Sequence, residues 1–264
     1  MKKYLQIIKG TWAEYMEYRL SFVLWRLRMV MQLLVTYFLW WALFGARNQL
    51  FGYTQAMMFT YIFLSLIVRP LVMGTRTQEL GNMINNGALS NYLTHPIDIL
   101  RYFFSRDIAD KALNMVFAVF EIGVLYIILR PPIVLQANPG ALLLTLAAIG
   151  VGTMLFFYFS LMLSYVGFWS SDVWAPRFLS FMLVEFFGGM LFPLDILPQP
   201  LFVLAQSLPF SYFLYFPIKL YLGHLSSLAA IQGFVIGLLW LGIFYVVADW
   251  MWHRGLRVYG VEGR

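Results

Sequence analysis

Few side chains in this sequence have the chemistry to move a proton or a charge, and two of them are carboxylates in strongly apolar surroundings. Glu121 lies in the apolar run 112–129 and Glu185 in the run 178–192. An ionisable group at the bilayer centre costs about 2.5–3.5 kcal/mol on insertion scales, so it normally faces protein or water. The two glutamates therefore belong either to a substrate or proton pathway or to hydrogen bonds that fix helix packing. No chain of further acids suggests a proton relay, which favours packing; each glutamate should then tolerate Gln but not Lys.

Histidines and nucleophiles that could form a catalytic or metal site are scarce. The three histidines, His95, His224 and His253, are far apart in sequence, and cysteine is absent. The chain contains no G-x-x-x-x-G-K-[ST] phosphate loop, no H-E-x-x-H zinc motif and no G-x-S-x-G nucleophile turn. These absences argue against ATP hydrolysis through a phosphate loop, against a zinc protease of that class and against a thiolate metal site. We therefore expect no catalytic residue, no metal ion and no cofactor in this chain.

The elements that carry these residues follow from an apolar composition. Of 264 residues, 61% are apolar and only 11% are charged, against roughly 25% charged residues in a soluble domain. This composition excludes an ordinary soluble enzyme, a disordered segment and a fibrous repeat. A helix needs about 20 mostly apolar residues to cross a bilayer, and six windows qualify, the fifth of them short. They are residues 22–44, 53–73, 112–129, 141–168, 178–192 and 228–250. The sequence predicts an all-α membrane protein with six transmembrane helices in a single domain, residues 1–264.

The distribution of lysine and arginine predicts the orientation of these helices. With a cytoplasmic N-terminus, fifteen Lys and Arg residues fall in inside segments, and only Arg47, Arg130 and Lys219 fall outside. This asymmetry follows the positive-inside rule, and six spans also place the C-terminus in the cytoplasm. Membrane topology thus accounts for the net charge of +6, and no basic stripe with interleaved aromatic residues suggests a nucleic-acid partner. Arg69 and Asp249 lie near the expected cytoplasmic interface, where their side chains should extend toward water.

Two segments outside the spans have unusual compositions. Residues 1–19 place apolar side chains on one helical stripe and most charges elsewhere, which predicts an amphipathic helix lying in the cytoplasmic headgroup layer. Residues 193–227 contain five prolines among aromatic and aliphatic residues, which excludes one straight helix. Because this outside segment is also too apolar for a solvated loop, we expect two short re-entrant helices, at residues 200–207 and 211–222, that enter the outer leaflet and return.

The largest expected cytoplasmic loop, residues 75–111, carries a short apolar stretch. A turn at Gly87 precedes Leu89, Tyr92 and Leu93. After His95, a second short helix is expected to begin at Pro96, with Asp98 inside its first turn, where the helix dipole favours an anion. A merely solvated loop has no need for leucine and tyrosine on an exposed face, so this stretch is a candidate binding surface for a partner.

Two local stretches in this layout resemble the permease subunits of type-2 ABC exporters, specifically bacterial half-size permeases encoded apart from their ATPase. Residues 86–98, NGALSNYLTHPID, look like the coupling-helix region of that class between spans two and three. Residues 189–198, GMLFPLDILP, look like the end of span five and the start of the re-entrant helices. The resemblance covers essentially the whole chain.

The resemblance implies a division of labour. Two permeases, identical or sister subunits, would form the substrate pathway in the bacterial inner membrane, and two copies of a cytoplasmic ABC ATPase would bind ATP and Mg²⁺ beneath them. The coupling residues would be Gly87, Leu89, Tyr92, Leu93, His95 and Pro96. The direction of transport, export, also comes from the resemblance.

Two other classes of protein fit the composition. A self-contained secondary transporter of amphipathic compounds is one alternative, and a membrane-embedded enzyme or scaffold is another. Secondary transporters often show similar halves or helices broken at matching positions. Residues 20–130 and 140–250 show no convincing repeat, and the irregular segment occurs only between the last two expected spans. This asymmetry favours the exporter permease.

Overall fold

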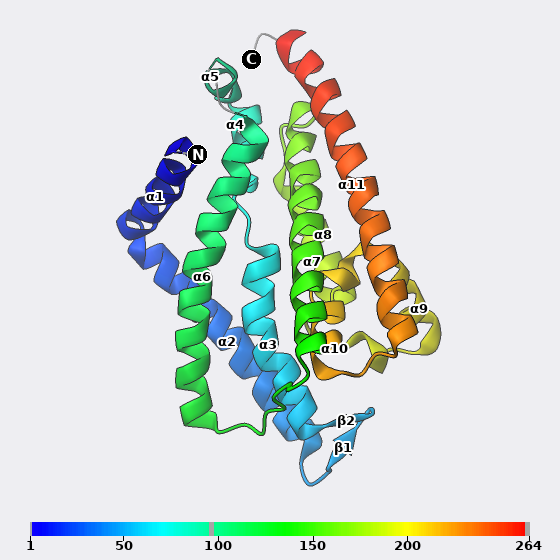
Figure 1. Cartoon of the computed structure of the whole chain (residues 1–264). Coiled ribbons are helices and arrows are strands. Elements are labelled where there is room, and N and C mark those ends of the chain that lie inside the picture. The colour runs from blue at the N-terminus through cyan, green and yellow to red at the C-terminus, as the bar shows by residue number, and fades with distance from the viewer. Residues whose placement is uncertain (1, 95–97, 262–264) are drawn as a thin grey trace.

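The computed structural model describes residues 2–94 and 98–261, and its architecture is almost wholly helical (Figure 1). The α-helices are α1 (Lys2–Glu17), α2 (Arg19–Phe44), α3 (Gln55–Met73), α4 (Gln78–Asn85), α5 (Leu89–Leu93), α6 (Ile99–Leu129), α7 (Pro139–Tyr165), α8 (Trp174–Phe187), α9 (Gln199–Ser207), α10 (Tyr215–Leu222) and α11 (Ser227–Val261). Short 3-10 turns are η1 (Val166–Phe168), η2 (Leu194–Ile196) and η3 (Pro209–Tyr212). Two strands, β1 (Gln49–Leu50) and β2 (Tyr53–Thr54), form an antiparallel hairpin that the sequence analysis did not predict.

Within the described ranges, five helices are long and apolar enough to cross a bilayer: α2, α3, α6, α7 and α11. The fifth expected span, residues 178–192, is instead the 14-residue helix α8. At 1.5 Å per residue this helix is about 21 Å long, short of the roughly 30 Å of a hydrocarbon core. The helix ends at Gly188, and Gly189 takes a left-handed φ of +79°. The described structure therefore supports five candidate spans rather than six.

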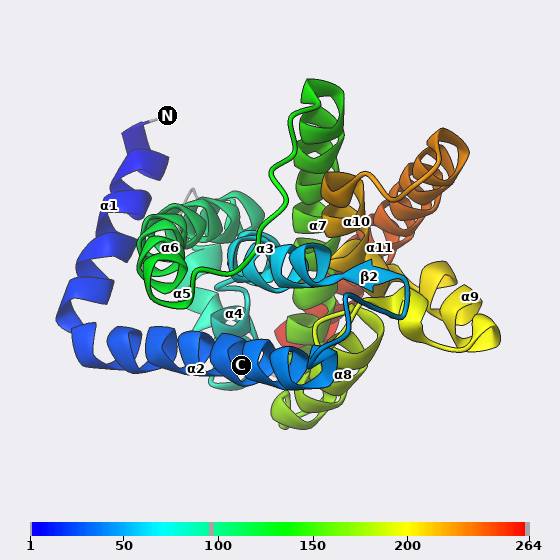
Figure 2. The same cartoon turned by 90° about the horizontal axis from the view of Figure 1, so that it is seen from below.

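The long helices place distant segments at two ends of the molecule. Figure 1 shows α1, α4, α5 and the C-terminal part of α11 at one end, here called the termini end. The β-hairpin and α10 lie toward the opposite end, the hairpin end. Helix α3 is central and packs against α2, α6, α7 and α10, and the view in Figure 2 shows α2 and α8 on the same side of α3.

The N-terminal segment forms the expected helix, and it bends away from α2 at Tyr18 (Figure 2). Helix α1 packs against α6, and the Trp12 indole N–H donates to the carbonyl oxygen of Ala109 at 2.8 Å. Leu5 and Met16 remain exposed, at 58% and 62%. An exposed apolar stripe on a helix whose opposite side is held by protein is typical of contact with a membrane surface, and this placement stays a prediction.

The expected loop helices and the proline-rich segment are both helical, with shifted boundaries. Helix α6 begins at Ile99, and the Asp98 carboxylate caps it by accepting from the backbone N–H of Arg101 at 2.9 Å. The prediction that Asp98 lies inside the first turn is therefore wrong, because Asp98 is the N-cap residue that precedes the helix. Pro96 lies outside the described residues. In the proline-rich segment, α9 and α10 are two short helices joined through η3, and their re-entrant placement stays a prediction.

Candidate functional site

Glu121 forms a bidentate ion pair with Arg26 that joins α6 to α2. The Arg26 Nε–H donates to Glu121 Oε1 at 2.7 Å, a second guanidinium nitrogen donates to Oε2, and Nη1 donates to Asn114 Oδ1 at 3.2 Å. The two charged side chains are only 5% and 13% exposed. By sequence, Arg26 counts among the cytoplasmic flanking charges, but in the structure it is buried against an acid 95 residues away. A fully paired carboxylate favours the packing interpretation of Glu121.

Glu185 is also paired, and its partner corrects one expectation. The Arg69 Nη2 donates to Glu185 Oε2 at 3.1 Å, and the Gln32 amide donates to Oε1 at 2.9 Å. The prediction that Arg69 extends toward water is wrong, because its side chain is 15% exposed and points inward from α3. The pair joins α3 to α8, and the amide adds a link to α2. A carboxylate on a helix facing this arginine compensates the charge more effectively than the distant interface.

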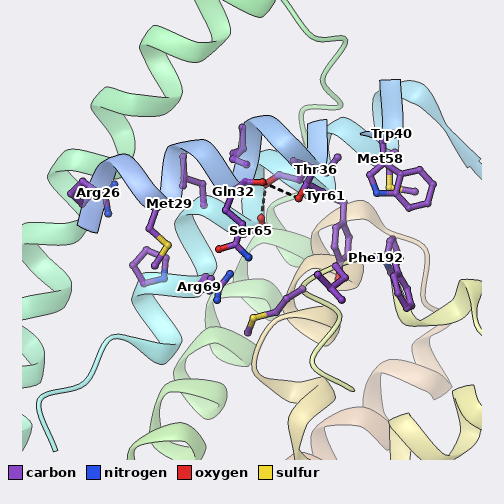
Figure 3. A pocket seen from close by; sticks show the side chains of 17 residues that line it. Arg26, Met29, Gln32, Thr36, Trp40, Met58, Tyr61, Ser65, Arg69 and Phe192 are labelled. Atoms are coloured by element: carbon purple, nitrogen blue, oxygen red, sulfur yellow. Dashed lines mark hydrogen bonds between the residues drawn. The ribbon is translucent and has the colours of Figure 1, made fainter. Parts of the chain in front are cut away.

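These two arginines line one pocket between α2, α3 and the segment after α8 (Figure 3). The space inside it that a water-sized molecule can occupy is about 40 Å³. Its polar lining consists of Arg26, Gln32, Thr36, Ser65 and Arg69, together with the hydroxyl-bearing Tyr61. Its apolar lining comes largely from methionine, leucine and aromatic residues, including Met29, Trp40, Met58 and Phe192 (Figure 3).

The charges in this pocket are neutralised, and its free space is small. Arg26 is neutralised by Glu121 and Arg69 by Glu185, so neither cation is free for a small anion. Mixed apolar walls with a few hydroxyl and amide groups are typical of a site for a molecule with both apolar and polar parts, but in this conformation the pocket has room for only a few water molecules. Arg26 and Arg69 both line the pocket, whereas their acidic partners Glu121 and Glu185 do not belong to its lining.

The candidate coupling residues are at the termini end, on α4 and α5, a pair here called the platform (residues 78–93). Gly87 takes a φ of +77°, the left-handed turn that glycine allows. Leu93 is 45% exposed, whereas Tyr92 is half-buried and packs against Tyr102 with ring centroids 5.5 Å apart. His95 and Pro96 lie outside the described residues, so the structure places four of the six candidates.

The expectation that Leu89 faces outward is wrong. Leu89 is 0% exposed and belongs to a core cluster with Leu80, Ile84 and Phe103. Helix α11 reaches the same cluster through Tyr259. The apolar stretch is therefore divided between a buried side, which attaches the platform to the helix bundle, and an exposed side, which includes Leu93.

A second charged cluster, which was not predicted from the sequence, attaches α1 to the platform. The Arg106 guanidinium donates to Glu14 Oε2 and to Glu79 Oε2, both at 2.5 Å. Arg76 donates to the same two acids, at 3.4 Å and 2.9 Å. Two arginines and two glutamates from α1, α4, α6 and the segment before α4 thus form one network, which Arg76 extends to Asp110 on α6 at 3.5 Å. Arg76 and Glu79 are three residues apart, but the nearest pair that joins two helices, Glu79 and Arg106, is separated by 27 residues and gives no local signal.

The hairpin end has its own ion pair. Lys219 on α10 is 4% exposed and donates to Asp195 Oδ2 at 2.8 Å and to the Tyr53 hydroxyl at 2.9 Å. Tyr53 in turn donates to Asp195 Oδ1 at 2.8 Å. Burial raises the pKa of Tyr53, so its hydroxyl stays protonated and remains a donor. This triad joins the β-hairpin, η2 and α10.

The described residues show no metal site, and a comparison with known proteins identifies the family to which the chain belongs. Within the described ranges, no group of three or more His, Cys, Asp or Glu side chains is arranged to hold a metal ion. Comparison with curated proteins found no match. A protein-family model described as "ABC-2 family transporter protein" matches residues 30–263, which include the rest of α2, the platform, both ion-paired glutamates and the proline-rich segment. Because this single model covers most of the chain, the protein belongs to the ABC-2 family of transporter proteins and is a membrane permease of that family.

Proposed function

We propose that this chain is the membrane-spanning subunit of an ATP-driven exporter, which works as a dimer and is coupled to a separate cytoplasmic ATPase. The observation that carries the proposal is the platform, which presents Leu93 at the termini end while Leu89 and Tyr259 attach it to the helix bundle. A rigidly attached surface of this kind transmits movement of a bound partner into the helices. The ATPase, present in two copies, would bind ATP and Mg²⁺, since this chain has no phosphate loop.

The proposed orientation places the termini end in the cytoplasm. The positive-inside rule supports this placement, because most Lys and Arg residues lie toward that end. Helix α8 then acts as a sixth, incomplete span: its roughly 21 Å of helix is continued by residues 188–193 toward the hairpin end. In this arrangement α9 and α10 are the re-entrant helices at the outer leaflet of a bacterial inner membrane.

Exposed apolar surface supports pairing with a second permease. On α8, the side chains of Leu179, Met182 and Phe186 are 64%, 46% and 38% exposed. Such a surface requires lipid or protein contact. A second copy or a sister subunit facing α8 would place the pocket beside α2 and α3 close to the dimer interface, where it would form part of a pathway for an amphipathic cargo.

Coexpression with a candidate ATPase tests the proposal. The ATPase encoded nearest to the gene for this chain would be coexpressed with the tagged permease, and the complex would be purified in detergent and reconstituted. We expect recovery of two ATPase copies with two permeases, and ATP turnover that depends on the permease. Substrate movement in the absence of any ATPase, driven by an ion gradient, would instead support a secondary transporter and contradict the proposal.

A further inference from the structure

An open groove beside α8 contains an arginine that lacks an acidic partner. Arg177 donates from Nη1 to the Ser160 hydroxyl at 3.3 Å and from Nη2 to the Ser164 hydroxyl at 2.5 Å and to the Ser160 carbonyl at 3.4 Å. Its Nε is buried and has no hydrogen-bond partner. Hydroxyl and carbonyl groups orient a guanidinium but do not neutralise its charge.

The other arginines buried between helices differ from Arg177 in this respect. Arg26, Arg69, Arg76 and Arg106 each contact at least one carboxylate. In the part of the chain that the structure describes, no ion pair involves Arg177, and no acidic residue lines its groove. Arg177 is half-buried, as Arg69 and Arg76 are, and charged side chains that are withdrawn from water in this way are normally paired. The exception indicates that the anion comes from outside the chain.

A second cation lines the same groove. Arg28 on α2 is exposed and makes no hydrogen bond or ion pair with any residue in the described ranges. The groove is open to the surroundings and offers about 510 Å³ of space. Thr75, Gln78 and Ser180 add polar groups to its lining. Two unneutralised arginines and several hydrogen-bonding groups are the features that recognise a phosphate or a carboxylate.

The rest of the groove is apolar and aromatic. Phe156 and Phe159 come from α7, and Phe181 comes from α8. Trp174 and Phe178, which stack with ring centroids 5.0 Å apart, are 65% and 48% exposed. Aromatic side chains of this kind do not contribute to binding a free inorganic ion, but they can pack against a hydrocarbon tail. Charge at one part of the groove and aromatic walls along the rest match a molecule that is both anionic and amphipathic.

We propose that this groove binds a membrane amphiphile with an anionic headgroup, whose phosphate or carboxylate contacts Arg177 and Arg28 and whose tail lies along the aromatic wall. The assignment to the cytoplasmic leaflet rests on the proposed function, because Arg177 is in the first turn of α8 and the termini end is there taken as cytoplasmic. Under the proposed function, anionic amphiphiles are then the class of molecule that enters the permease from the inner leaflet.

Direct binding to the purified full-length permease tests the proposal without an ATPase. The protein is placed in phosphatidylcholine nanodiscs, and phosphatidylglycerol carrying bromines on its acyl chains is titrated in, with tryptophan fluorescence as the readout. We expect quenching that depends on the anionic headgroup, and a Trp174→Phe variant should lose much of it. Arg177→Gln should weaken binding about tenfold, since it removes a charge-assisted contact, and Arg177→Lys should restore part of the affinity.

Controls keep the result interpretable if Arg177→Gln fails to fold. Arg28→Gln removes an exposed side chain without a partner, so its fold should be retained while binding weakens severalfold. Arg101→Gln is the matched control, because Arg101 lies at the same end and is 74% exposed; its binding should equal that of the wild type. Wild-type affinity in the Arg177→Gln and Arg28→Gln variants would overturn the proposal.

Other outcomes would overturn it in distinct ways. Full competition by inorganic phosphate, with no preference between brominated phosphatidylglycerol and brominated phosphatidylcholine, would identify a site for a free anion. No quenching in a wild-type dimer, with cross-linking of introduced cysteines across α8, would show that a second copy covers the groove. Arginine-dependent lipid binding without any ATPase association would leave this inference standing and remove the proposed coupling instead, so the two failures are distinguishable.

Discussion

Tyr259, near the C-terminal end of α11, donates its hydroxyl proton to the carbonyl oxygen of Gly87 at 2.8 Å, and the backbone N–H of Ser90 donates to the same hydroxyl at 3.1 Å. One side chain thus satisfies two backbone groups at the turn between α4 and α5. Its ring also packs against Phe168, with centroids 6.0 Å apart. The platform is consequently attached to the last helix of the bundle as well as to its neighbours in sequence.

Replacing this hydroxyl should loosen the platform without unfolding the protein. Tyr259→Phe keeps the ring packing but removes two hydrogen bonds, each of which contributes about 0.5–1.5 kcal/mol. We expect faster amide hydrogen exchange over residues 86–93 and weaker coupling between ATP turnover and transport, with the ATPase still bound. Tyr126→Phe is the control, because Tyr126 is 50% exposed and lies on α6. Unchanged exchange in the Tyr259→Phe variant would show that these bonds do not hold the turn.

The exposed side of the platform should carry the contact with the ATPase. Leu93→Asp places a charge where a leucine side chain is 45% exposed, so the free permease should fold normally. A hot-spot residue contributes about 2 kcal/mol, and its loss should weaken ATPase association roughly 30-fold. The measurement is co-purification together with ATP turnover. Leu135→Asp is the control, since Leu135 is 82% exposed in the loop between α6 and α7. Wild-type recovery with Leu93→Asp would exclude this side as the docking surface.

Leu89→Asp should behave differently, although sequence alone gives the two leucines the same role. Leu89 is completely buried among Leu80, Ile84 and Phe103, so an aspartate there would be a desolvated charge without a partner. Loss of ATPase binding in this variant would report a disrupted platform rather than a lost contact. An apolar stretch of five or six residues looks the same in sequence whether it faces a partner protein or its own bundle, because the packing of α11 against it is not a local property.

Long-range pairing explains what else the sequence could not reveal. The apolar windows located the long helices because hydropathy is a local property, and residues 1–19 read as amphipathic for the same reason. The partner of Glu121 is 95 residues away and that of Glu185 is 116 residues away. Such pairs depend on which helix faces meet, so Arg26 and Arg69 looked like ordinary flanking charges. Helix α8 proved short because a glycine pair ends it, a detail that the hydropathy of residues 178–192 conceals.

The orientation can be tested with single introduced cysteines, since the natural chain has none. Arg257→Cys on α11 and Gln199→Cys on α9 are both at exposed positions. We expect a membrane-impermeant maleimide to label Gln199→Cys in intact spheroplasts and Arg257→Cys only after the membrane is opened. The cysteine-free parent supplies the background. Labelling of Gln199→Cys from the cytoplasmic side alone would reverse the proposed topology.

The ion pair at the hairpin end should be needed for stability. Asp195→Asn leaves the amine of Lys219, which is 4% exposed, without a countercharge, and we expect the thermal midpoint in detergent to fall by several degrees. The double variant Asp195→Asn with Lys219→Met removes both charges and should recover most of the loss. The midpoint is measured by fluorescence-detected unfolding. Equal midpoints for the single and double variants would indicate that the charge pair contributes nothing beyond packing.

The partner of Glu121 changes what a glutamine substitution should do. If Glu121 had no charged partner, a glutamine in its place would simply preserve hydrogen bonding. Because Arg26 lies beside it and is 5% exposed, the glutamine substitution leaves a buried cation without a countercharge. Breaking a buried pair from one side costs about 3–5 kcal/mol, so Glu121→Gln should lower expression and thermal stability markedly.

A double-mutant cycle separates this structural role from a role in transport. Arg26→Gln combined with Glu121→Gln removes both charges and should restore stability to near the wild-type level, while Gln6→Ala on exposed α1 controls for general effects. Transport by the reconstituted double variant should then be close to normal if the pair only holds α2 against α6. A stable double variant that binds the ATPase and supports ATP hydrolysis but moves no cargo would instead place Glu121 in the substrate pathway. That result would contradict the packing interpretation.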